Sequence, residues 1–390
     1  MNRLTTRQRR ASSRRISRQQ RLPISKFDGI LVMIIAALAL WSPHVSRGLR
    51  GLAGESLAAA PVTTPKEPKK AIAVLVQGPA DGLKTWTDRF GILSNPAFNK
   101  TFSADIKLIY ASFDRPVSLA DGGWMCDGNA NLEGFSCKSS FVPNSTWTEG
   151  RNALTRLAWC DENQEDFLYW AFFDDDVDWL CPDVGDGLPC WNKYFSMLEV
   201  AASYDVPYVA GQPYVSQHGM FRAATNFDAA ANAIHHDYVT RILPYAYLPV
   251  NTSQWHSQAV QFHLLNTCFK EMSIAFPGIR IINPAHRPYV RGLNATQVDD
   301  LTQKNYQQYV PFIGGTDIYQ HNGQGTLPNW TDLADHLQQR HQIQLERDPD
   351  GVCEQGLTER FFNFLNRKNG WHNDRAYDVC DPLPYEVDYM

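Results

Sequence analysis

The sequence predicts an α/β fold with a mostly parallel central sheet and helices on both faces. Short apolar runs typical of buried strands occur at Ala71–Gly78, Ile106–Phe113 and Phe167–Phe173. Between the first two runs, apolar residues recur at helical spacing from Trp86 onward. Because strands that alternate with helices pair in parallel, the pattern predicts a Rossmann-like sheet.

The alternation of strand and helix continues along the chain. A helix is predicted over residues 148–158, directly before the strand at Phe167. A further helix near Tyr194–Ala201 precedes a strand at Pro207–Gln212. Residues 331–390 are predicted to form a C-terminal helical extension. No internal repeat is visible in this body.

The net charge of −5 hides an uneven distribution of charged residues. Residues 1–28 carry nine Lys and Arg and one acid, which leaves 27 bases, 40 acids and a net charge of −13 for the remainder. Nucleic-acid binding requires clustered Lys and Arg against the phosphate backbone. The acidic body is therefore not expected to bind nucleic acid.

The amino-terminal region is predicted to anchor the protein in a membrane. Residues 1–26 are rich in Arg and Ser, hold no acid and are expected to form a disordered cytosolic tail. The uncharged apolar run Gly29–Trp41 has 13 residues, fewer than the roughly 20 that usually span a bilayer. Flanking residues extend it to a signal-anchor transmembrane helix over residues 27–44, with the basic end in the cytosol. Residues 45–70, rich in Pro, Gly, Ala and Lys, are expected to form a stem.

This organisation predicts a single-pass type II protein of the Golgi or endoplasmic reticulum membrane, with its body in the lumen. All eight cysteines and five Asn-x-Ser/Thr sequons lie on the carboxyl side of the apolar run, as expected for that compartment. Cys126 with Cys137, and Cys181 with Cys190, are close enough in sequence to close small loops, although sequence alone does not choose the pairing. A cleaved signal peptide and a mitochondrial transit peptide are the alternatives to the anchor.

The strand at Phe167–Phe173 runs directly into four carboxylates, those of Asp174, Asp175, Asp176 and Asp178. We call residues 174–178 the acidic segment. Four carboxylates this close together do not stay buried without a counter-cation, and ligands of α/β sheets bind beyond the carboxyl ends of the strands. Because side chains alternate along an extended segment, the first and third aspartates can face one ligand while the second turns away. The segment therefore predicts a divalent-metal site; the alternatives are a solvated acidic turn and a structural calcium loop.

An apolar strand that ends in Asp-x-Asp, after a helix with Arg and Asn and behind a signal anchor and stem, resembles the nucleotide-sugar-dependent glycosyltransferases of the GT-A fold. The resemblance covers about residues 71–291 and is to the superfamily pattern. It implies a bound Mn²⁺ or Mg²⁺, which stabilises the negative charge that develops on the diphosphate leaving group. The metal ligands that it implies are Asp174 and Asp176. The implied contacts with the nucleotide sugar are made by Gln77, Gly78, Arg151, Asn152, Asp174 and Asp175.

The resemblance also implies functional residues later in the chain. A further metal ligand in this fold is often a His from a late segment, and His286 is our candidate. Inverting members use an acid to deprotonate the acceptor hydroxyl. Asp228 and Asp237 are the candidates, because residues 255–258 hold no acid. A retaining route that needs no such base stays open.

These assignments predict a nucleotide-sugar-binding half, residues 71–215, and an acceptor-binding half, residues 216–330. Aromatic and His residues in the second half suit a carbohydrate face. The predicted function is transfer of a sugar from a nucleotide-sugar donor to a glycan, glycoprotein or glycolipid acceptor in the secretory lumen. One alternative is a non-catalytic carbohydrate-binding or scaffold protein on the same fold. Another is a metal-dependent hydrolase, for which more clustered His and Asp ligands are expected.

Overall fold

The computed structural model describes part of the chain, from Ala71 to Asn366 with gaps. The described residues are 71–91, 100–126, 132–143, 145–182, 189–211, 220–224, 228–245, 258, 261, 264–269, 271–282, 326–348 and 351–366. The predicted tail, signal anchor, stem and His286 lie outside them. Among the described residues, no helix has both the length and the apolar character needed to cross a membrane.

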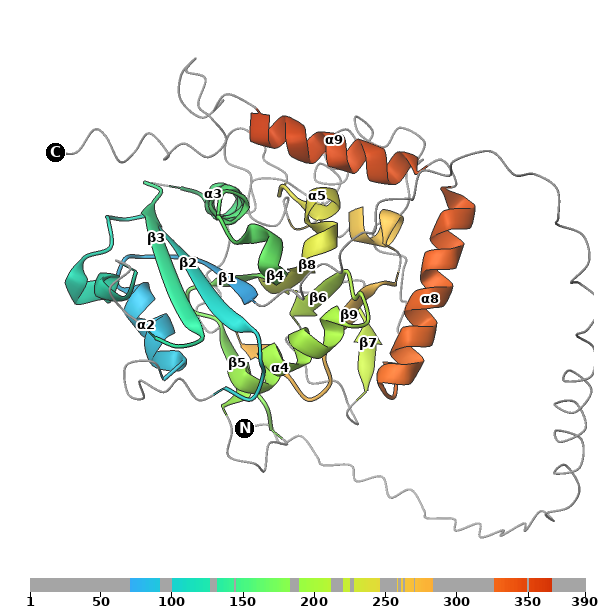
Figure 1. Cartoon of the computed structure of the whole chain (residues 1–390), viewed down its shortest axis with the longest axis horizontal. Helices are drawn as coiled ribbons and strands as arrows, with labels where there is room; N and C mark the ends of the chain where they lie inside the picture. Colours follow the sequence, from blue (N-terminus) through green and yellow to red (C-terminus); the bar gives the residue numbers. More distant parts are fainter. Residues whose placement is uncertain are drawn as a thin grey trace, which may run out of the picture. The chain divides into compact units, whose positions relative to one another are not determined.

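A nine-stranded sheet forms the centre of the described body (Figure 1). Its strand order is β11-β7-β9-β6-β8-β4-β1-β2-β3, and a separate two-stranded sheet pairs β5 with β10. The strands are β1 Ala71–Gly78, β2 Asp105–Ser112, β3 Phe135–Phe141, β4 Phe167–Asp174, β5 Asp178–Leu180, β6 Tyr208–Gly211, β7 Phe221–Ala223, β8 Asp228–His235, β9 Ser273–Ala275, β10 Arg280–Ile282 and β11 Thr326–Leu327.

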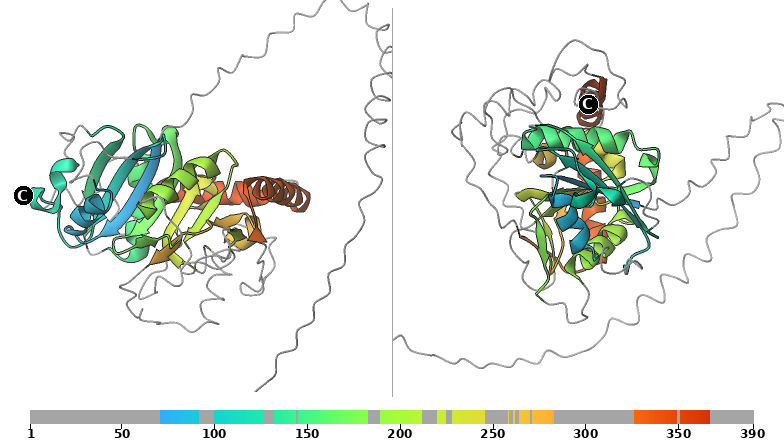
Figure 2. Two further views of the ribbon diagram at one scale, coloured as in Figure 1. Left: turned by 90° about the horizontal axis from the view of Figure 1, so that it is seen from below. Right: turned by 90° about the vertical axis from the view of Figure 1, so that its left-hand side faces the viewer.

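Helices pack against both faces of the sheet, as predicted (Figure 2). The α-helices of the described residues are α2 Gly82–Arg89, α3 Trp147–Trp159, α4 Cys190–Ala202, α5 Val239–Ile242, α8 Trp330–Arg347 and α9 Val352–Asn366. Phe173 of β4 points toward α2, where its ring lies 5.3 Å from that of Trp86. Trp170 points to the opposite face, 6.4 Å from Trp159 of α3. The alternation along β4 therefore continues to its tip, where Asp174 faces α3.

The prediction of a mostly parallel sheet is correct for one half of it. Strands β3, β2, β1 and β4 pair in parallel, in the 3-2-1-4 order with which doubly wound nucleotide-binding folds begin. Beyond β4 the sheet is mixed, because β8 is antiparallel to both β4 and β6. Farther out, β9 is parallel to β6, and β7 is antiparallel to β9.

Strand β8 is one of the elements that sequence patterns did not indicate. Its residues, Asp-Ala-Ala-Ala-Asn-Ala-Ile-His, include four alanines and two polar residues with low strand propensity. In the sheet it lies between β4 and β6, and Ala230, Ala231 and Ala233 are buried. Neighbouring strands approach closely there, since a Cβ atom added to Gly211 would lie 2.3 Å from the Ala231 carbonyl oxygen. Burial between two strands thus outweighs local propensity.

Two disulfides close the short loops that the cysteine spacing suggested, Cys126–Cys137 and Cys181–Cys190. Cys160 and Cys268 are also disulfide-bonded. The second bridge joins the residue after β5 to the first residue of α4. It therefore ties the chain that leaves the acidic segment to a helix on the sheet.

The close approach of β6 and β8 makes Gly211 sensitive to substitution. We expect Gly211→Ala to lower the free energy of unfolding by roughly 1–3 kcal/mol, because the new methyl group overpacks against a backbone carbonyl that cannot turn away. Denaturant unfolding of the purified chain measures this change. An unaltered midpoint would contradict the described pairing of these strands.

Candidate functional site

The candidate site lies where the order of the sheet changes direction. From β1 the chain adds β2 and then β3 on one side, whereas β4 pairs with the other side of β1. Crevices at such switch points, beyond the carboxyl ends of the strands, are where α/β sheets bind their ligands. Gln77 of β1 lies directly opposite Asp174 of β4 in this register. The acidic segment therefore begins at the switch point.

Helix α2 holds the acidic segment from one side through its backbone. The indole Nε1 of Trp86 donates a hydrogen bond to the Asp175 carbonyl oxygen, at 3.0 Å. The guanidinium of Arg89 donates to the same oxygen, at 3.1 Å, and to the carbonyl oxygen of Val177. This guanidinium also lies 5.5 Å from the centre of the Trp86 ring. Two side chains one helical turn apart thus fix the path of the turn.

Helix α3 holds the segment from the opposite face through a side chain. The Asp174 Oδ1 atom accepts a hydrogen bond from Trp147 Nε1, at 2.8 Å, and forms an ion pair with Arg151 Nη2, at 2.5 Å. Arg151 is fully buried, and its guanidinium lies 4.9 Å from the Trp147 ring centre and 5.6 Å from that of Phe172. Each helix therefore contributes one Trp and one Arg to the acidic segment.

The carboxylate of Asp175 turns away from Asp174 and packs against the tip of β1. Its Cβ atom fills the space beside Gly78, where the hydroxyl of Tyr110 also lies. Tyr110 donates a hydrogen bond to the Pro79 carbonyl oxygen, at 2.6 Å. Burial raises the pKa of Asp175 to about 6, and the neighbouring Asp176 and Asp174 charges add to this effect. The charge of Arg89 opposes this shift but does not cancel it.

The two remaining carboxylates differ in exposure. Asp176 is half-buried and Asp178 is exposed. Asp178 begins β5 and lies opposite Ile282, the last residue of β10. His286 follows four residues later and lies outside the described residues. In the part of the chain that the structure describes, no three His, Cys, Asp or Glu side chains converge as a metal site.

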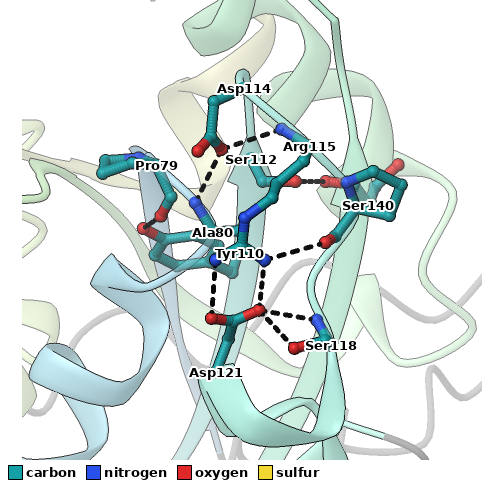
Figure 3. A network of polar contacts seen from close by, with 10 residues as sticks. Pro79, Ala80, Tyr110, Ser112, Asp114, Arg115, Ser118, Asp121 and Ser140 are labelled. Carbon is teal, nitrogen blue, oxygen red and sulfur yellow. Dashed lines mark hydrogen bonds and ion pairs between the residues drawn. The ribbon is translucent and has the colours of Figure 1, made fainter.

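A second polar network joins the carboxyl ends of the first three strands (Figure 3). Asp114 accepts hydrogen bonds from the backbone amides of Ala80 and Arg115, both at 2.8 Å. The Arg115 guanidinium forms a two-point ion pair with Asp121, which also accepts two hydrogen bonds from Ser118. The network ties the loop after β1 to the segment after β2. The loops beyond the first strands are therefore connected to one another beside the switch point.

Two of the predicted donor-binding residues bond to the chain itself. The side-chain amide of Gln77 donates to the Thr146 carbonyl oxygen at 3.1 Å. Asn152 forms a reciprocal pair with the backbone of Tyr245, with both hydrogen bonds at 2.9 Å. Together with Arg151, these residues attach α3 to the sheet. Their predicted contacts with a nucleotide sugar stay predictions.

The two candidate bases lie at opposite ends of β8. Asp228 begins β8 opposite Gly211. This end of β8 lies beside the carboxyl end of β4. Asp237 follows the other end of β8, where His235 pairs with Tyr169 near the start of β4. Five residues of strand, roughly 17 Å at about 3.3 Å per residue, separate that position from Asp174. Because β8 runs antiparallel to β4, Asp228 lies at the end of β8 nearer the acidic segment and Asp237 follows the other end. Both stay predictions as the base.

Sequence reasoning missed Trp86, Arg89 and Trp147. A signal for them is present, since each helix carries Trp and Arg three or four residues apart, on one helical face. That spacing alone does not distinguish residues that hydrogen-bond to a turn from residues on an ordinary buried helix face. The partner carbonyl groups of Asp175 and Val177 have no sequence signature.

Comparisons with known proteins give little support for a particular family. No protein-family model matches the chain, and no curated protein sequence matches it. Among solved structures, protein A197 from STIV is 12% identical over 49% of this chain and 95% of its own, with a TM-score of 0.28. The bifunctional glycosyltransferase WbbM, in its apo structure, is 9% identical over 62% of this chain and 45% of its own, with a TM-score of 0.26. These similarities carry no argument about function.

Gly78 is required for the close approach of the acidic segment to β1. A Cβ atom at this position would lie 2.4 Å from both Asp175 Cβ and Tyr110 Oη. We expect Gly78→Ala to push the turn outward and to lower the free energy of unfolding by roughly 1–3 kcal/mol. Denaturant unfolding measures the loss. If the variant unfolds at the same midpoint as the parent chain, the packing described here is incorrect.

The raised pKa of Asp175 predicts a pH-dependent stability difference. A carboxyl group whose pKa is higher in the folded than in the unfolded state loses stability as the pH rises through its folded value. In metal-free protein, Asp175→Asn should therefore raise the free energy of unfolding by about 1–3 kcal/mol above pH ~6. The gain should vanish below pH ~4. Thermal unfolding of both proteins from pH 4 to 8 tests this, and a gain that is independent of pH would contradict it.

Proposed function

We propose that the chain is a metal-dependent glycosyltransferase of the GT-A type. It moves a sugar from a nucleotide-sugar donor to a glycan, glycoprotein or glycolipid acceptor. The observation that carries this proposal is the register that sets Asp174 opposite Gln77 at the switch point of the sheet. Nucleotides bind at that position in α/β sheets, and an acidic segment there requires a cation before a diphosphate can approach.

The donor atoms of the acidic segment fit a hard divalent cation. Carboxylate oxygens suit Mn²⁺ or Mg²⁺, and four carboxylates lie within five residues at this end of β4. Asp176 is the ligand that we favour, with Asp174 and His286 as the further candidates. Diphosphate oxygens and water complete the coordination of such ions in many sites. When bound, the cation stabilises the negative charge that develops on the departing diphosphate.

The chain itself orients the reactants around this position. The tip of β1, at Gln77 and Gly78, and the side chain of Asp175 form the floor of the proposed donor site. Asp228 is the base that we propose for an inverting reaction, because its backbone lies at the end of β8 that is beside the carboxyl end of β4, where Asp174 lies. There it would accept the proton of the acceptor hydroxyl as that oxygen attacks the sugar.

The proposed setting is the lumen of the Golgi or the endoplasmic reticulum. Residues 27–44 act as a signal anchor in this proposal, and residues 45–70 as a stem. Every cysteine with a described side chain is disulfide-bonded, which suits an oxidising compartment. The partners are a nucleotide sugar, a glycan acceptor and the membrane.

A second candidate function is a carbohydrate-binding or scaffold protein without turnover. One observation favours it: Gln77, Arg151 and Asn152 all have partners within the chain. Fewer groups are then free to bind a donor than the sequence suggested. A scaffold would bind glycans without consuming nucleotide sugars.

Donor turnover distinguishes the two functions. We expect the full chain with Mn²⁺ to release nucleoside diphosphate from one member of a nucleotide-sugar panel. Asp176→Asn should reduce the rate by about 10²–10³-fold, the usual effect of losing one electrostatic stabiliser of the transition state.

Asp161→Asn is the matched control, because Asp161 is a buried, ion-paired aspartate whose partner, Lys107, lies near the start of β2. This variant should retain the parent rate. Glycan binding without release of nucleoside diphosphate from any donor would instead support the scaffold.

A further inference from the structure

We propose that Asp174 is a positioning residue rather than a cation ligand, because its ion pair with Arg151 neutralises the negative charge of the Asp174 carboxylate. The inference rests on the proposed function, since it concerns which aspartates hold the cation. It changes the role implied by the Asp-x-Asp pattern. The carboxylate of Asp174, at the end of β4, fixes the position of the acidic segment, and the carboxylates that follow it bind the cation.

The Oδ1 atom of Asp174 is already saturated. A carboxylate oxygen has two lone-pair positions, and those of Oδ1 face Trp147 Nε1 at 2.8 Å and Arg151 Nη2 at 2.5 Å. The side chain of Asp174 is 13% exposed, and that of Arg151 is 0% exposed. A cation at Asp174 would therefore stand beside a buried positive charge, with little solvent to screen the repulsion.

Among the described residues, Asp174 is the carboxylate that pairs with Arg151. Its guanidinium is stacked against Trp147 and Phe172. The nearest carbonyl oxygens, those of Ala229 and Ala230, are 3.5 and 3.4 Å from Nη2. The Nε and Nη1 atoms are buried and have no hydrogen-bond partner among the residues that the structure describes. Separating the pair would leave a buried charge without compensation, which is strongly destabilising.

The ion pair determines which carboxylates remain available. With Asp174 held toward α3 and the Asp175 carbonyl group held by Trp86, the segment leaves the sheet in one direction. The half-buried Asp176 and the exposed Asp178 follow. The geometry therefore points to these two carboxylates as the part of the segment that a divalent cation contacts.

Affinity for Mn²⁺, measured by calorimetry on the full chain, tests the assignment. Asp176→Asn should weaken binding by about 100-fold or more. Asp174→Asn keeps the shape of the side chain and should weaken binding at least tenfold less than that. Combining Asp174→Asn with Arg151→Met removes both charges, and this double variant should bind Mn²⁺ within about threefold of the parent. Asp161→Asn serves as the control and should bind like the parent.

Equal losses in Asp174→Asn and Asp176→Asn, with no recovery in the double variant, would overturn the inference and leave the proposed function intact. No Mn²⁺ binding by the parent chain would overturn the proposed function instead. In that case thermal unfolding still tests the ion pair. Each single substitution should lower the Tm, and the double variant should recover at least half of the loss. A double variant whose losses simply add would show that Arg151 does not position Asp174.

Discussion

The buried ion pair between Arg151 and Asp174 is the interaction on which the rest of the site depends. Asp174 ends a strand whose other residues lie in the aromatic core, so its carboxylate leaves water as the sheet forms. A buried carboxylate requires a partner of opposite charge, and removing that partner costs several kcal/mol. Arg151 comes from the helix directly before the strand. One short stretch of chain thus provides both the charge and its compensation.

The backbone around the other carboxylates of the acidic segment is fixed by a neutral and a cationic donor. Trp86 and Arg89 donate to carbonyl groups, and the charge of Arg89 also acts on Asp178, Asp175 and Asp176. This arrangement holds the turn in place. Burial, together with the charges of Asp176 and Asp174, still raises the pKa of Asp175. Perturbed carboxyl groups in a crevice of a sheet are typical of functional sites, where stability is lost in return for a charged surface.

The sequence was informative where burial and local pattern agree, and uninformative where they conflict. Continuous apolar runs located β1, β2 and β4 to within a residue, because strands buried on both faces have no other composition. Strand β8 escaped notice because its alanines are selected by close strand packing. The same limitation applies to the site. Asp174 and Arg151 were both identified from sequence, but their contact depends on the facing of α3 and β4. Neither spacing nor composition encodes that contact.

The contacts that α2 and α3 make with the acidic segment also bear on its two alternative interpretations. In a solvated acidic turn the carboxylates would be exposed and the backbone unsupported, whereas here one carboxylate is paired inside the protein and two helices bond to the turn. A structural calcium loop uses backbone carbonyl groups among its six to eight oxygen ligands. The carbonyl groups of Asp175 and Val177 already accept hydrogen bonds from Trp86 and Arg89, so they are not oriented for an ion. Within the acidic segment, our assignment leaves the carboxylates of Asp176 and Asp178 for a cation, and His286, outside the described residues, stays a candidate ligand. Coordination by so few protein groups leaves most positions open to water or to a phosphate-bearing ligand, as a substrate site requires.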